Sequence, residues 1–269
     1  MSDAKEPLAG GSGGGVFEAL VAPALSLLEQ LGSYIQLTGT TVAWVFRSPF
    51  RLTQYLAHME FIGVRSSFII VLTGLFSGMV LALQTVQSLR QFGAESNVSG
   101  IVAYSLVTEI SPVFASLMVT ARAGSSMAAE LGNMRVSEQI DALQTMAVSP
   151  VQYLLSPRLV ASVLMLPLVC IVYSAVGMAG AWLVAVQWLE IDPGIFIDNA
   201  DDFLELNHLV MGVIKAATFG FLIATLSCHQ GYLVKGGAKG VGLATTRAVV
   251  QSAVSILVAN YMITSMMTE

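Results

Sequence analysis

The sequence predicts an all-α integral membrane protein with five transmembrane helices, an N-terminal membrane-embedded or interfacial helix, and a short cytoplasmic helix between two of the spans. Two observations lead to this fold class. Of the 269 residues, 55% are hydrophobic and only 11% are charged, whereas about 25% are charged in a typical soluble domain. The apolar residues also gather in long runs, and about 20 helical residues are enough to cross the ~30 Å hydrocarbon core of a bilayer.

The N-terminal quarter of the chain is expected to lie in the cytoplasm and at the membrane surface. Residues 1–15 are polar and rich in Gly and Ser, and we expect a disordered cytoplasmic tail. Residues 16–66 are expected to form an interfacial or membrane-associated helical segment. Its first part, Val16–Phe46, is apolar but contains two glutamates and three expected helix breaks, at Pro23, Gly32 and Gly39. A surface helix is our interpretation, and an additional span is the alternative.

Residues 67–269 are predicted to form one five-span domain. The spans are expected at about 67–89, 101–121, 159–188, 209–228 and 244–267. Small residues recur at four-residue spacing in two of them, at Gly74 and Gly78 and at Gly212, Ala216 and Gly220. Such spacing lets helix backbones approach closely in a membrane. We therefore expect these two spans to pack tightly against neighbours.

The placement of Lys and Arg predicts the orientation, because positively charged loops stay in the cytoplasm. With five spans from Ser67 onward, one side of the membrane collects ten basic residues, namely Lys5, Arg47, Arg51, Arg65, Arg122, Arg135, Arg158, Lys235, Lys239 and Arg247. On the other side, Arg90 stands among many carboxylates. The prediction is a multi-pass protein with a cytoplasmic N-terminus and a periplasmic C-terminus.

Two opposite charges lie inside predicted spans. A carboxylate such as Glu109 at membrane depth costs about 2.5–3.5 kcal/mol on insertion scales and needs a partner or a polar cavity. Lys215 lies at a similar distance from the outer end of its own span. One hypothesis is an ion pair or shared polar network that lines a substrate cavity. The alternative is two unrelated groups that contact water or lipid headgroups.

A short amphipathic helix is expected in the cytoplasmic segment between the second and third spans. Ser137 is predicted to cap it, with Glu138 and Asp141 in its first turn and Ile140 and Leu143 on one face. From its residues alone, this helix either docks into a partner's groove or lies on the membrane surface.

Four sequence motifs carry a family resemblance. They are Thr108-Glu109-Ile110-Ser111-Pro112-Val113, Ala121-Arg122-Ala123-Gly124-Ser125, the segment 129–143 (AELGNMRVSEQIDAL), and Gly242-Leu243-Ala244-Thr245-Thr246-Arg247-Ala248-Val249-Val250. Together they resemble the MlaE-type permeases, the membrane subunits of ABC transporters associated with MCE proteins. The likeness extends from about Ser67 to the end of the chain.

The resemblance implies a homodimeric permease in the bacterial inner membrane that moves phospholipid and serves outer-membrane lipid asymmetry. Two ABC ATPase subunits, which use ATP and Mg, would bind on the cytoplasmic side, and a ring of MCE-domain subunits would bind on the periplasmic side. The permease itself would bind no cofactor or metal.

The resemblance also assigns roles to residues. Glu109, the apolar Leu81 and Phe92, and Lys215 match positions at the family's lipid cavity. The segment that contains Arg135, Glu138, Gln139, Ile140, Asp141 and Leu143 corresponds to the coupling helix that meets the ATPase. Thr108 is a departure, because relatives often have arginine before the glutamate. This leaves Lys215 as the candidate counter-charge to Glu109.

Other function classes fit the sequence less well. The chain has no Gly-x-x-x-x-Gly-Lys-[Ser/Thr] phosphate loop, so we expect ATP hydrolysis by a partner rather than enzymatic activity of its own. An ion-coupled secondary transporter is the main alternative, since such proteins carry intramembrane acids, although no internal repeat is visible. His58, His208 and His229 lack metal-ligand spacing. No nucleic-acid partner is expected.

Overall fold

The computed structural model describes residues 14–45, 47 and 51–267, and every regular element within them is helical. The α-helices are α1 (Gly14–Val45), α2 (Leu52–Ile62), α3 (Ser67–Arg90), α4 (Val98–Ser105), α5 (Ser111–Val119), α6 (Ser125–Val136), α7 (Gln139–Thr145), α8 (Ser156–Gln187), α9 (Pro193–Phe203), α10 (Leu206–Tyr232) and α11 (Gly237–Met267). Short 3₁₀ turns lie at Val64–Ser66 and Glu95–Asn97. Single π-helical turns lie at Leu106–Ile110, Thr120–Gly124 and Val151–Leu155.

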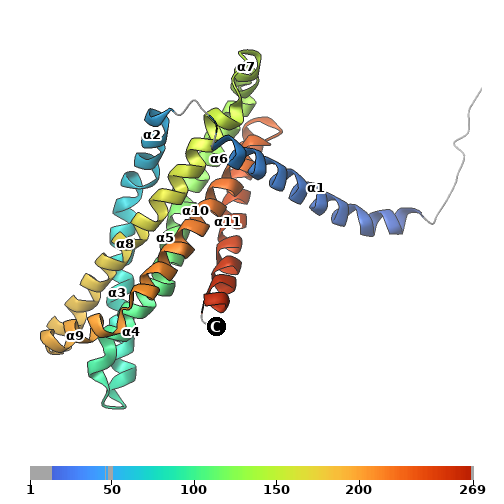
Figure 1. The fold of residues 1–269 in the computed structure, drawn as a ribbon. Helices are drawn as coiled ribbons and strands as arrows, with labels where there is room; N and C mark the ends of the chain where they lie inside the picture. Colours follow the sequence, from blue (N-terminus) through green and yellow to red (C-terminus); the bar gives the residue numbers. More distant parts are fainter. Residues whose placement is uncertain (1–13, 46, 48–50, 268–269) are drawn as a thin grey trace, which may run out of the picture.

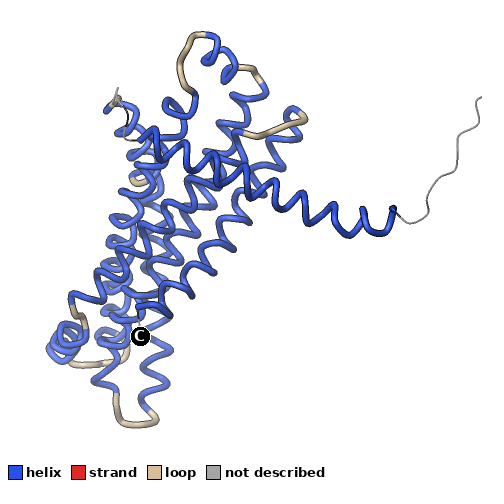
Figure 2. Tube along the Cα trace, turned by 45° about the vertical axis from the view of Figure 1, so that its right-hand side comes forward, coloured by secondary structure: helices blue, strands red, loops and turns tan. Residues whose placement is uncertain are grey.

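Five helical segments are long and apolar enough to cross a membrane, which confirms the predicted fold class. They are Leu52–Arg90, Glu95–Val136, Val151–Trp188, Leu206–Tyr232 and Gly237–Met267. They run side by side in one bundle (Figure 1), and the loops gather at its two ends (Figure 2). One end carries α7, and the opposite end carries α9 and the turn between α3 and α4.

The N-terminal helix α1 leaves the bundle at the end that carries α7 and projects away from it (Figure 1). It continues through Pro23, Gly32 and Gly39, so the expected breaks there were wrong. At Gly32 and Gly39 the cost is only about 1 kcal/mol each relative to alanine, which a long apolar helix tolerates. Of the predicted tail, residues 1–13 lie outside the described residues, and Gly14 already begins α1.

Polar contacts attach the second half of α1 to α10. The Tyr34 hydroxyl lies 2.7 Å from the Thr225 hydroxyl, and the Ser33 hydroxyl lies 3.0 Å from Nε2 of His229. The predicted segment 16–66 contains most of α1 and all of α2. The turn at 64–66 joins α2 to α3, so α2 belongs to the first long apolar segment. Whether α1 spans the bilayer or lies on its surface stays a prediction.

Close backbone contact between spans confirms the packing expected from the small residues. A methyl group added at Gly78 would collide with the backbone of Gly177 on α8, and one added at Gly212 would lie 2.6 Å from the carbonyl oxygen of Val107. Glycine is therefore required where α3 crosses α8 and where α10 crosses the π turn at 106–110. These crossings fix the depth of the polar residues in the bundle.

Candidate functional site

The π-helical turn at Leu106–Ile110 is the local feature that builds the site. Pro112 has no N–H group, so the carbonyl of Thr108, four residues earlier, has no donor at that position of the helix. Nζ of Lys215, on α10, donates to this carbonyl oxygen at 2.8 Å. Single π turns inside α-helices occur frequently at functional sites. Pro112 therefore leaves the main-chain carbonyl of Thr108 available as a hydrogen-bond acceptor for Lys215.

Glu109 lies in the same turn and forms an ion pair with Lys215. Nζ of Lys215 is 2.6 Å from Oε1 of Glu109, so of the two hypotheses for these intramembrane charges the structure shows the ion pair. Two residues of α11 complete the network. Nδ2 of Asn260 donates to Oε2 at 2.8 Å, and the Thr264 hydroxyl donates to Oε1 at 2.9 Å. The carboxylate thus joins three spans.

The two charges differ in their exposure. The Lys215 side chain is 0% exposed, whereas 36% of the Glu109 side chain is exposed. A buried ammonium without an anionic partner would carry a large desolvation cost. The geometry therefore makes Glu109 the group that a ligand would contact, and Lys215 the group that holds it in place.

Asn260 and Thr264 were not identified from the sequence. They stand four residues apart on the last span, so they share one face of the helix. The Thr264 hydroxyl also lies 2.8 Å from the carbonyl oxygen of Asn260, so its one proton is shared between this oxygen and Glu109. The sequence signal for both is an amide inside an apolar span that is followed one helical turn later by a hydroxyl.

Leu81 and Phe92 do not belong to this polar network. Leu81 is partly buried on α3 and packs against the main core. Phe92 follows the end of α3 and is 81% exposed. Their assignment to a lipid cavity stays a prediction.

An apolar groove lies beside the π turn. It has a volume of about 420 Å³ and is lined by residues of the second, third and fourth spans, among them Val107, Pro112, Pro167, Ile171, Gly212 and Val213. Two of the lining residues are prolines and one is a glycine, which leave space between the helices. The groove is large enough to hold part of an apolar ligand.

At the α7 end of the bundle, the short helix is anchored to the spans. Ile140 is fully buried in a second core cluster with Leu131, Leu154, Leu155 and Cys228. Glu138, Gln139 and Asp141 are exposed. The apolar face of α7 is thus buried inside the protein, and the polar side chains of this segment are exposed.

The predicted cap of α7 was wrong. The Ser137 hydroxyl donates to the carbonyl of Asn133 and so completes the end of α6. Glu138 precedes α7 in a left-handed conformation, with φ 58°. A second constraint comes from Arg135, whose Nη1 lies 2.6 Å from Oδ1 of Asp141. This pair ties the last turn of α6 to the first turn of α7.

A buried ion pair near this end escaped the sequence analysis. The Arg158 side chain is 1% exposed, and its Nη2 lies 2.8 Å from Oε2 of Glu130, whose side chain is 49% exposed. Nη1 of Arg158 also donates to the carbonyl of Leu154 at 2.6 Å. The pair links α6, which continues into α7, to the first turn of α8. The sequence analysis did not pair the two residues, because α7 separates them along the chain and Arg158 was counted only as one of the basic residues of the cytoplasmic side.

No group of three or more His, Cys, Asp or Glu side chains that could hold a metal ion is present among the residues that the structure describes.

Comparison with known proteins identifies the family. The family model described as Permease MlaE matches residues 55–266. A probable ABC transporter permease protein of Rickettsia felis is 38% identical over 242 residues, which cover 90% of this chain and 93% of the relative. The intermembrane phospholipid transport system permease protein MlaE of Haemophilus influenzae is 36% identical over 210 residues, which cover 78% of this chain and 80% of the relative. The chloroplastic protein TRIGALACTOSYLDIACYLGLYCEROL 1 of Arabidopsis thaliana is 36% identical over 229 residues, which cover 85% of this chain and 65% of the relative. The chain therefore belongs to the MlaE permease family and is an ABC transporter permease.

Proposed function

We propose that this chain is the permease subunit that moves phospholipid between a bacterial inner membrane and a periplasmic MCE protein, powered by a separate ABC ATPase. The observation that carries the proposal is the partly exposed Glu109, held inside apolar spans by the buried Lys215 and by two residues of α11. A polar group fixed at membrane depth gives an amphipathic cargo a contact that the surrounding lipid lacks.

The groove beside the π turn contains neither Glu109 nor any residue of α11, and it offers a lipid cargo a separate apolar surface. Its lining is almost entirely apolar. Each buried methylene contributes about 0.8 kcal/mol, so acyl chains bind such a surface without many specific contacts. The name of the Haemophilus relative, a phospholipid transport permease, favours phospholipid as the cargo of this chain.

The outer face of α11 supports a homodimer. Val250, Val254, Leu257 and Tyr261 are exposed along this helix, on which Asn260 contacts Glu109. A second copy packed against α11 would cover these side chains and enclose the exposed part of Glu109. In this arrangement the lipid cavity lies between the two permeases.

The helix α7 is the proposed coupling helix. Its exposed Glu138, Gln139 and Asp141 offer a polar surface to an ATPase, while Ile140 fixes the helix to the bundle. Movement of the ATPase would reach α8 through α6 and the pair of Glu130 with Arg158. The N-terminus would then lie in the cytoplasm with α7, and the C-terminus in the periplasm.

Purification from the native membrane in mild detergent tests the assembly. Mass spectrometry of the purified complex is expected to find an ABC ATPase, an MCE protein and stoichiometric phospholipid. Transport driven by an ion gradient in vesicles that contain this chain without any ATPase would instead establish an ion-coupled secondary transporter.

Two substitutions test the assigned residues separately. Glu138→Lys reverses an exposed charge on the proposed coupling surface, and we expect ATPase binding to weaken at least about tenfold, a loss of ~1.4 kcal/mol. Gln91→Lys, at an exposed position at the opposite end of the bundle, is the control and should leave binding unchanged. Glu109→Gln should reduce lipid transfer while the complex stays assembled. Unchanged transfer in this variant would remove Glu109 from the cavity.

A further inference from the structure

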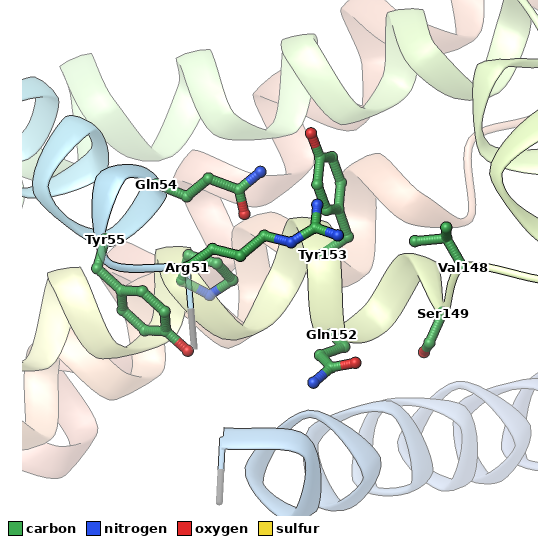
Figure 3. A pocket seen from close by; sticks show the side chains of 8 residues that line it. Arg51, Gln54, Tyr55, Val148, Ser149, Gln152 and Tyr153 are labelled. Atoms are coloured by element: carbon green, nitrogen blue, oxygen red, sulfur yellow. The ribbon is translucent and has the colours of Figure 1, made fainter. Parts of the chain in front are cut away.

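A polar pocket lies at the α7 end of the bundle, where two spans begin. Arg51, Gln54 and Tyr55 come from the start of α2, and Ser149, Gln152 and Tyr153 come from the segment that leads into α8. Figure 3 shows these side chains around one opening, with Arg51 extended across it toward Tyr153. We call this opening the Arg51 pocket. It shares no lining residue with the apolar groove and contains no member of the Glu109 network.

The chemistry of the pocket favours an anion. Its lining contains one guanidinium, two amides, two phenols and one serine hydroxyl, and no carboxylate. The guanidinium of Arg51 lies over the Tyr153 ring, 4.9 Å from its centroid. Among the described residues, no ion pair joins Arg51 to an acidic side chain. Stacking on an aromatic face leaves the edge N–H groups of a guanidinium available, and their planar fork matches phosphate oxygens.

The surroundings of the pocket match the surface of a bilayer. Arg47, just after α1, stacks on Trp44 at 5.0 Å, and Nε2 of Gln152 donates to the carbonyl of Arg47 at 3.1 Å. Trp and Tyr concentrate at membrane–water interfaces, and basic side chains favour the cytoplasmic one. Next to Arg51, Leu52 and Leu56 are 72% and 64% exposed, one helical turn apart. An apolar strip thus runs along α2 from the mouth of the polar pocket.

We propose that the Arg51 pocket binds the phosphate of an anionic phospholipid in the leaflet at this end of the protein, with the acyl chains along Leu52 and Leu56. Arg51 provides the charge, and the further donors are the Gln54 amide and the hydroxyls of the two tyrosines and Ser149, while the Gln152 amide holds the Arg47 carbonyl. The bound lipid bridges α2 to the segment that directly follows the coupling helix. This site is separate from the proposed transport cavity and depends on no particular cargo.

Lipid binding to the full-length chain tests the proposal. Native mass spectrometry of the purified protein counts molecules of phosphatidylglycerol bound per chain, with dioleoylglycerol as the probe that lacks phosphate. We expect Arg51→Gln to lose one bound phosphatidylglycerol, with an affinity about tenfold lower at that site. Arg65→Gln is the matched control, because Arg65 is also exposed near α2 but pairs with Glu60 at 3.6 Å. It should keep the full number of lipids.

Two further arms separate the possible ligands. Arg51→Lys keeps the positive charge and should bind more lipid than Arg51→Gln. This partial recovery would show that Arg51→Gln loses the lipid through loss of charge and not through misfolding. Inorganic phosphate that displaces the lipid at millimolar concentration would assign the pocket to free phosphate and overturn the lipid proposal. Equal lipid counts for the wild type and Arg51→Gln would also overturn it, as would loss of this lipid when the ATPase binds, because the surface would then be a protein contact.

Discussion

Removing either partner of the Glu109–Lys215 pair should have unequal effects on stability. Glu109→Ala leaves the fully buried Lys215 ammonium with the Thr108 carbonyl as its remaining hydrogen-bond partner. Loss of one partner of a buried ion pair costs about 3–5 kcal/mol. Lys215→Met leaves a carboxylate that is 36% exposed and still accepts from Asn260 and Thr264. Its cost should be that of a lost charged hydrogen bond, about 1–3 kcal/mol.

The double variant completes the test. With both charges removed, no stranded ammonium remains, so Glu109→Ala/Lys215→Met should be more stable than Glu109→Ala alone by about 2 kcal/mol. Reversible unfolding in mixed micelles of mild detergent and sodium dodecyl sulfate gives the free energies of unfolding of the wild type, the two single variants and the double variant. Equal costs for the two single variants, or additive costs in the double variant, would refute the reasoning from burial.

Two further predictions concern packing and the second ion pair. Glu130→Ala strands the buried Arg158 and should lower the free energy of unfolding by about 3 kcal/mol, and adding Arg158→Met should recover most of the loss; a double variant no more stable than the single one would contradict this. Gly78→Val should cost about 3 kcal/mol, because its side chain collides with the backbone of Gly177. Thermal unfolding followed by size-exclusion chromatography measures it, with Gly242→Ala as a control where an added methyl meets nothing within 4 Å; equal melting temperatures for the two would exclude the collision.

Apolar runs can be located from the sequence because hydropathy depends only on local composition. All five predicted ranges lie inside the helical segments of the structure. The pairing of Glu109 with Lys215 was also accessible, since helix rise converts residue counts into depth. The sequence does not give the rotation of each helix about its own axis, which determines the side chains that face a neighbouring span. For that reason, the contacts of Asn260 and Thr264 with Glu109 were missed.

Local rules failed where two helices meet in a tight turn. Serine before an acidic residue is a common start of a helix, yet Ser137 completes α6 and Glu138 takes the left-handed position. The choice depends on Ile140, which must reach the buried cluster at this end of the bundle. Tertiary packing thus shifted the start of α7 by one residue, and one residue was enough to change the role of Ser137.

The pairing of Glu109 with Lys215 also determines how the site responds to the membrane potential. A single charge moved across the membrane gains or loses about 2.3 kcal/mol per 100 mV. Because the carboxylate and the ammonium are in direct contact, their forces in the transmembrane field cancel. A rearrangement that carries both groups together is therefore electrically silent, and the voltage of an energised membrane neither drives nor opposes it.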